Sequence, residues 1–183
     1  MHDSANATNA ANGSPPRPTI RPFDVPAAGP APVKPIPDDY PRVVPYLCVT
    51  AASAAIEFYR TVFDARERMR MAEPDGRIGH AELAIGTAVV MLSDEFPDVG
   101  ITAPPTLGGT PVTLTVYVTD VDDVFRRAID AGAKPVRPLK DQFYGDRTAT
   151  FEDPFGHRWT IATRIENVSA QEIAARAAAM TGG

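Results

Sequence analysis

An imidazole and a carboxylate stand two positions apart in residues 78–85, which read IGHAELAI: His80 and Glu82. Alternating apolar residues predict a strand here, and residues two apart in a strand lie on the same face. The pair could therefore hold a metal ion or move a proton. Two ligands make a weak, open site, because catalytic zinc normally has three protein ligands. We expect no metal here and keep a displaced two-ligand site as the alternative.

A second pattern lies in residues 112–119, VTLTVYVT, where apolar and hydroxyl-bearing side chains alternate without a break. The apolar face must pack against the core, so the other face looks towards water or towards a ligand. We expect several strands to turn polar side chains to this same face and to form a small-molecule pocket, the alternative being a solvated sheet face. The expected ligand-binding residues are Tyr46, Cys48, Glu82, Thr113, Thr115, Tyr117, Arg158 and Thr160, with Tyr144 in a neighbouring turn.

Hydrophobic periodicity and turn residues predict the order βαβββ twice, followed by a helix. A shift of 69 places Thr50 on Thr119, and a shift of 70 places Gly86 on Gly156, which indicates an internal duplication. The expected strands are 42–50, 66–72, 78–85, 87–93, 112–119, 134–139, 146–152 and 157–163, and the expected helices are 51–63, 120–131 and 168–180.

Four stretches carry a family resemblance: AAIEFYRTVFDA, GHAELAIGTAVVMLSD, DAGAK and the DPFG-x-x-W-x-I pattern within FYGDRTATFEDPFGHRWTIA. Together they resemble the vicinal oxygen chelate superfamily, the glyoxalase/bleomycin-resistance/dioxygenase group, over about residues 42–166. The resemblance implies an α+β fold in which two tandem βαβββ modules, 42–94 and 112–163, form a curved mixed sheet. Helices cover its convex face, the concave face holds the ligand, and modules pair within or between chains. Residues 167–183 are expected to form a C-terminal helix and tail.

The resemblance also supplies a test for metal. Metal-using members carry one ligand on the first and last strand of each module, positions that we map to Val44, Val90, Thr113 and Thr160. Valine cannot bind a cation, and a threonine hydroxyl is a poor ligand for zinc, nickel or iron. The sequence therefore predicts no metal and no other cofactor.

Composition limits the partners and the compartment. The 183 residues carry a net charge of −5 and show no basic run, so we expect neither nucleic acid nor membrane as a partner. One cysteine excludes an internal disulfide, and no secretory signal or apolar span is evident, so we expect a cytoplasmic protein. Residues 1–41 hold ten of the 19 prolines and are expected to be extended or disordered.

The leading hypothesis is a metal-independent small-molecule-binding protein, similar to bleomycin-resistance proteins, that acts as a homodimer. One alternative is a glyoxalase-like lyase or isomerase that acts on a small metabolite. It would use a displaced metal on His80 and Glu82, or acid–base chemistry by Glu82 and a tyrosine. Another alternative is a ligand-free interaction protein. The identity of the ligand stays open.

Overall fold

The computed structural model describes residues 33–181 of the chain. Contacts divide the chain into Met1–Pro35 and Ile36–Gly183, and the second unit holds every helix and strand of the described residues. Most of the expected tail, residues 1–41, lies outside the described residues. Its last part, 36–41, belongs to the second unit. Within 33–181, no helix has the length and apolar character that a transmembrane span requires.

The first module forms a four-stranded mixed sheet with one long helix. Its elements are β1 (Tyr46–Val49), α1 (Ala52–Phe63), β2 (Arg66–Ala72), β3 (Ile78–Ile85) and β4 (Ala88–Asp94). The strand order is β1-β4-β3-β2, with β1 parallel to β4 and the other pairs antiparallel. A short 3₁₀-helix, η1 (Pro97–Val99), and α2 (Pro104–Leu107) lead to the second module.

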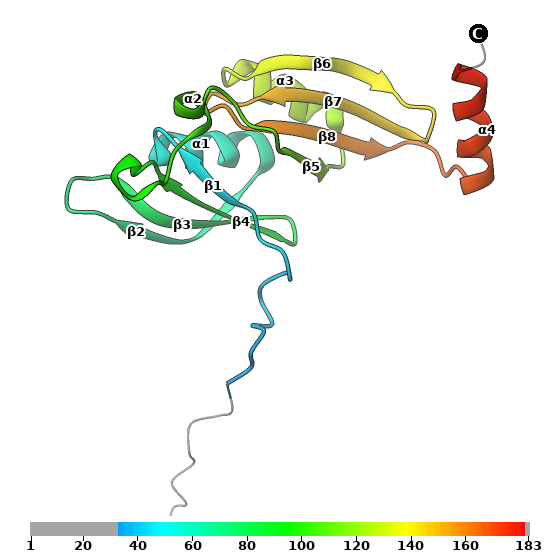
Figure 1. Ribbon diagram of the computed structural model, residues 1–183. Coiled ribbons are helices and arrows are strands. Elements are labelled where there is room, and N and C mark those ends of the chain that lie inside the picture. The colour runs from blue at the N-terminus through cyan, green and yellow to red at the C-terminus, as the bar shows by residue number, and fades with distance from the viewer. Residues whose placement is uncertain (1–32, 182–183) are drawn as a thin grey trace, which may run out of the picture. The chain divides into compact units, whose positions relative to one another are not determined.

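The second module repeats this arrangement (Figure 1). It contains β5 (Thr113–Tyr117), α3 (Val121–Asp130), β6 (Lys134–Asp141), β7 (Asp146–Glu152) and β8 (Arg158–Arg164), and α4 (Ala170–Thr181) follows. The strand order is β5-β8-β7-β6. The predicted α+β class and the repeated βαβββ order are confirmed, and each module contributes its own sheet.

Helices α1 and α3 pack on the apolar faces of the sheets, and they also contact each other. Alternation along each strand sends one set of apolar side chains to this shared core. The largest fully buried members include Trp159, Tyr59, Phe151, Ile56 and Leu83. We call the opposite face of each sheet, which α1 and α3 do not cover, its open face.

Two buried carboxylates fix the loops to the helices. Asp94, at the end of β4, accepts hydrogen bonds from the backbone N–H groups of Ala52 at 2.8 Å and Ile78 at 2.7 Å. Asp153, in the turn after β7, accepts from the Tyr59 hydroxyl at 2.7 Å and from the Trp159 indole N–H at 2.9 Å. Asp153 thus connects α1 of the first module to the DPFG turn of the second.

Strand pairing corrects the register of the duplication. Tyr46 lies opposite Met91 in the first sheet, and Thr115 lies opposite Thr160 in the second. Met91 therefore corresponds to Thr160, and the predicted match of Val90 to Thr160 is wrong by one residue. A slip of one residue moves a side chain to the other face of the sheet, and Val90 is indeed buried in the core beside Leu83.

Candidate functional site

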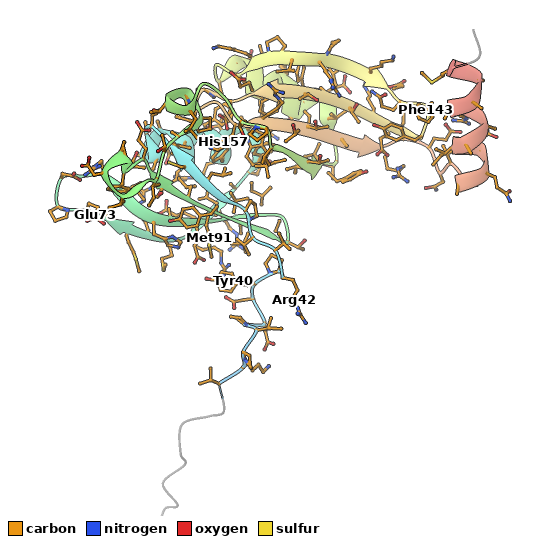
Figure 2. All side chains as sticks on the ribbon, viewed as in Figure 1. Tyr40, Arg42, Glu73, Met91, Phe143 and His157 are labelled. Atoms are coloured by element: carbon orange, nitrogen blue, oxygen red, sulfur yellow. The ribbon has the colours of Figure 1, made fainter. Side chains whose placement is uncertain are left out.

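The open face of the first sheet is built around Glu82, on β3. Its neighbours in the sheet are Met91 on β4 and Met69 on β2. Glu82 is only 4% exposed, although it lies on a face that the helices do not cover. Tyr40, which Figure 2 labels in the segment that precedes β1, donates a hydrogen bond to this carboxylate. A buried carboxylate needs partners to offset the loss of water, and several polar side chains supply them.

The side chains of Tyr40, Arg68 and His80 surround the Glu82 carboxylate. The Tyr40 hydroxyl donates a bifurcated hydrogen bond to it, 2.7 Å from Oε1 and 2.8 Å from Oε2. Arg68 Nη1 lies 3.6 Å from Oε2, and the Arg68 guanidinium also stacks 4.6 Å from the centre of the Tyr40 ring. The hydrogen bond to Glu82, with smaller contributions from burial and charge, raises the pKa of Tyr40 above its usual value near 10. Tyr40 therefore stays a neutral donor at physiological pH.

His80 extends this network towards solvent. Its Nε2 lies 3.4 Å from Glu82 Oε1, and its Nδ1 lies 3.0 Å from the Tyr46 hydroxyl. A carboxylate beside Nε2 favours a proton on that nitrogen, which leaves Nδ1 to accept the hydroxyl hydrogen of Tyr46. Tyr46 is 51% exposed. Tyr46, His80, Glu82 and Tyr40 thus form a continuous hydrogen-bonded chain whose outer end is accessible, an arrangement that could move a proton.

Cys48, next to Tyr46 on the same face along β1, is a poor nucleophile. Burial, and after it the charges of Glu95 and Asp94, raise the pKa of its thiol to about 11. The thiolate is the reactive form, so the group is almost entirely protonated at neutral pH. Its neighbour in the sheet, Ser93, has a buried hydroxyl without a hydrogen-bond partner among the described residues.

Three cross-strand rows make up the open face of the second sheet. The pairings give the rows Thr113–Arg158–Glu152–Lys134, Thr115–Thr160–Thr150–Arg137 and Tyr117–Ala162–Thr148–Lys140. In the middle row the Thr150 and Thr160 hydroxyls are hydrogen-bonded at 2.9 Å.

Tyr117 is the exposed aromatic residue of this face. The residue is 62% exposed, and its hydroxyl donates to Asp146 Oδ2 at 2.8 Å. Arg164 is ion-paired with the same carboxylate. The phenol is therefore held in position by one hydrogen bond while the ring stays available for stacking.

Two adjoining cavities lie on this open face. One, of about 370 Å³, is lined by Arg137, Pro138, Lys140, Gln142, Tyr144, Thr148, Thr150 and Thr160. The other, of about 200 Å³, is lined by Thr113, Val136, Arg137, Thr150, Arg158 and Thr160. Because they share Arg137, Thr150 and Thr160, they form one continuous hollow, which we call the β6–β8 hollow.

A third cavity, of about 630 Å³, lies beside β5 and is mainly apolar. It is lined by Pro41, Val43, Pro45, Ile85, Gly86, Thr87, Ala88, Val89, Val90, Leu114, Thr115, Val116, Tyr117 and Trp159. Several apolar side chains at this edge are exposed, including Val43 at 83% and Val112 at 58%. We call this cavity the apolar groove. Its lining is better suited to packing against an apolar surface than to catalysing a reaction.

The structure divides the predicted site residues between two sheets. Tyr46, Cys48 and Glu82 belong to the first open face, whereas the other six residues belong to the second sheet or its adjoining turn. Of the latter, Thr113, Tyr144, Arg158 and Thr160 line the β6–β8 hollow, while Thr115 and Tyr117 line the apolar groove. None of these three cavities is lined by residues of both sets.

The residues of these faces that were absent from the expected binding set include Tyr40, Arg68, Arg137 and Lys140. Tyr40 lies in a proline-rich segment that composition marks as a tail. Arg137 and Lys140 are three positions apart, and strict alternation places such residues on opposite faces. The alternation of β3, by contrast, was enough to predict that His80 and Glu82 lie on the same face of the strand.

The donor set does not fit a transition-metal site. With the corrected register, the positions that the family resemblance assigns to ligands are Val44, Met91, Thr113 and Thr160. A thioether and two hydroxyls are poor ligands for zinc, nickel or iron. Among residues 33–181 no group of three or more His, Cys, Asp or Glu side chains is placed to hold an ion.

Comparison with known proteins agrees with this architecture. Residues 41–161 match the family model of the Glyoxalase/Bleomycin resistance protein/Dioxygenase superfamily. The chain is 46% identical over 138 residues to "Uncharacterized protein Rv0887c" of Mycobacterium tuberculosis, a match that covers 74% of this chain and 81% of that protein.

Solved structures show the same fold. TioX from Micromonospora sp. ML1 is 31% identical, with a TM-score of 0.54 over 67% of this chain and 98% of TioX. The fosfomycin resistance protein FosX from Mesorhizobium loti has a TM-score of 0.50 at 16% identity over 71% of this chain and 93% of FosX, a likeness of fold alone. The chain therefore belongs to the glyoxalase/bleomycin resistance protein/dioxygenase superfamily.

Proposed function

We propose that this protein binds a small molecule on the open faces of its sheets, without a metal, in the manner of the bleomycin-resistance members of its superfamily. The observation that carries the proposal is the β6–β8 hollow. Hydroxyl, amide and cationic side chains line it, and the exposed Tyr117 ring lies on the same sheet face. A few convergent polar groups beside an aromatic surface are typical of ligand sites.

The proposal includes a homodimer. β1 and β5 are edge strands, each paired on one side only among the described residues. The apolar groove and the exposed Val43 and Val112 lie beside these edges, where a second copy would bury them. Pairing the first sheet of one copy with the second sheet of another would bring a Glu82 face opposite a β6–β8 hollow. The one cysteine is consistent with a cytoplasmic location.

A second candidate function rests on the chain Tyr46–His80–Glu82–Tyr40. A histidine with a carboxylate behind it and an accessible tyrosine in front is a usable general acid–base pair. Such a pair could remove a proton next to a carbonyl group, as a lyase or isomerase requires. Replacing His80 with Gln would then abolish turnover while leaving ligand affinity within a small factor.

Native mass spectrometry of the freshly purified protein tests the proposal. We expect the mass of a dimer, less than one metal ion per two chains, and additional mass from any small molecule that purifies with the protein. Treatment with a chelator should leave the melting temperature unchanged. One firmly held metal ion per chain, lost together with thermal stability, would contradict metal-free binding and would favour a metal-dependent lyase.

A further inference from the structure

The β6–β8 hollow concentrates positive charge from two strands. Arg137 and Lys140 come from β6, and Arg158 comes from β8. No carboxylate is among the side chains that line either cavity. The hollow is therefore locally positive, although the chain as a whole has a net charge of −5.

An irregularity in β6 brings two of these cations to the same face. Arg137 and Lys140 are three positions apart, so a regular strand would point them in opposite directions. Their partners on β7, Thr150 and Thr148, are two positions apart, because a register shift lies between the two pairs. A bulge of this kind redirects a side chain, and bulges are common next to binding sites. Both cations therefore lie on the face that carries Thr148 and Thr150.

Among the described residues, Arg137 and Lys140 form no ion pair, and Arg158 forms a single long one. The Arg137 and Lys140 side chains make no hydrogen bond or ion pair with any of residues 33–181. Arg158 is 4.0 Å from Glu152, and its buried Nε has no hydrogen-bond partner in the described part of the chain. Arg147 on β7, by contrast, binds two carboxylates, those of Asp122 and Asp141, at 2.8 and 2.7 Å.

Neutral donors complete the arrangement. In the Thr150–Thr160 pair one hydroxyl donates to the other, which leaves one hydroxyl hydrogen of the pair available. The Gln142 amide donates to Thr148 at 2.9 Å and has a second N–H to offer. Arginine binds carboxylate and phosphate groups through two parallel hydrogen bonds, and hydroxyls and amides complete such sites.

We propose that the β6–β8 hollow binds the anionic group of the ligand: a carboxylate, phosphate or phosphonate contacted by Arg137, Lys140 and Arg158. This inference rests on the proposed function, since it assigns a chemical class to the ligand of the same open face. The uncharged part of the ligand would extend along β8 and β5 towards the Tyr117 ring, which lies in the row next to that of Thr160.

Four probes of similar size and different charge test the assignment: phenylphosphonate, benzoate, benzyl alcohol and benzylamine. Each is titrated into the ¹⁵N-labelled full-length protein, and its Kd and the amide shifts are measured at low and at physiological salt. We expect an anion to bind most tightly, to shift amides of β6, β7 and β8, and to lose affinity as salt rises. The phosphonate and benzoate arms distinguish between the two oxyanion types.

A matched pair of variants gives the control. Lys140→Gln and Lys134→Gln remove the same charge from the same strand, but Lys134 lies outside the hollow. We expect Lys140→Gln and Arg137→Gln each to weaken anion binding about tenfold or more, and Lys134→Gln to change it by less than about twofold. The replaced side chains are exposed, so all three variants should fold.

Two results would overturn the inference. Equal or tighter binding of benzyl alcohol or benzylamine on the same face would refute the anionic class while leaving small-molecule binding intact. Failure of both anions to shift the β6–β8 amides would also refute it. Native mass spectrometry tests the proposed function separately, because it requires no choice of probe.

Discussion

The Tyr40 hydroxyl donates to both oxygens of the Glu82 carboxylate, at 2.7 and 2.8 Å, across 42 positions of sequence. This contact connects the segment before β1 to the centre of the first open face. Glu82 is only 4% exposed. Tyr40 therefore supplies the buried Glu82 with a neutral hydrogen-bond donor.

Tyr40→Phe should lower the midpoint of urea unfolding, because Glu82 loses a donor in a buried position. The Arg68 stacking partner remains, so the loss should be smaller than that caused by Tyr40→Ala. Two truncations give an independent comparison. Removing residues 1–35 keeps Tyr40 and should leave the midpoint unchanged, whereas removing residues 1–41 should lower it. Equal midpoints for both truncations would show that the Tyr40–Glu82 contact contributes nothing to stability.

Asp153→Ala should destabilise the protein by about 3 kcal/mol or more, because it leaves the Tyr59 hydroxyl and the Trp159 N–H buried without an acceptor. Tyr59→Phe removes only one of these bonds and should cost roughly half as much. Asp130→Ala, at an exposed carboxylate paired with Arg126, should cost at most about 0.5 kcal/mol. Denaturant unfolding followed by Trp159 fluorescence measures all three. An Asp153→Ala loss no larger than that of Asp130→Ala would contradict the bridging role of Asp153.

Cys48 should react slowly with iodoacetamide at pH 8, about 100-fold more slowly in the folded protein than in urea, because its pKa is raised from 9.0 to about 11. Since the folded state holds this proton more tightly, the associated stability is complete below pH 9 and is lost as the pH rises through about 11. The rate of alkylation of the folded protein should increase with pH up to that value. A rate that levels off near pH 9 would show an unperturbed thiol.

Most of the fold could be predicted from the sequence, because strands such as β5 alternate and the turns carry Gly, Pro or Asp. The register of the repeat could not, since Gly86 and Gly156 were taken as matching anchors although the two turns differ in length. Matching the buried Leu92 to Ile161 gives the correct shift of 69.

The site was only partly predictable, because some of its residues are placed by a bulge or by a tertiary contact that local patterns do not show. Alternation placed Thr113, Tyr117 and Thr160 on an open face. It cannot reveal a bulge, so it did not predict that Arg137 and Lys140 lie on the same face of β6. Tyr40 was missed because its contact with Glu82 is a tertiary one in a segment whose prolines suggest a tail.

The central claim, that the open sheet faces bind a small molecule, is tested most directly by mapping binding onto the wild-type protein and its Tyr117→Ala variant. A small-molecule library, together with any compound that purifies with the protein, is titrated against ¹⁵N-labelled chain. The account predicts that amide shifts gather on β5, β6, β7 and β8. It also predicts that Tyr117→Ala weakens binding by about 1–3 kcal/mol, while Thr119→Ala, beyond the end of β5, has little effect. Shifts confined to α1 and α3, or binding that Tyr117→Ala leaves unchanged, would contradict it.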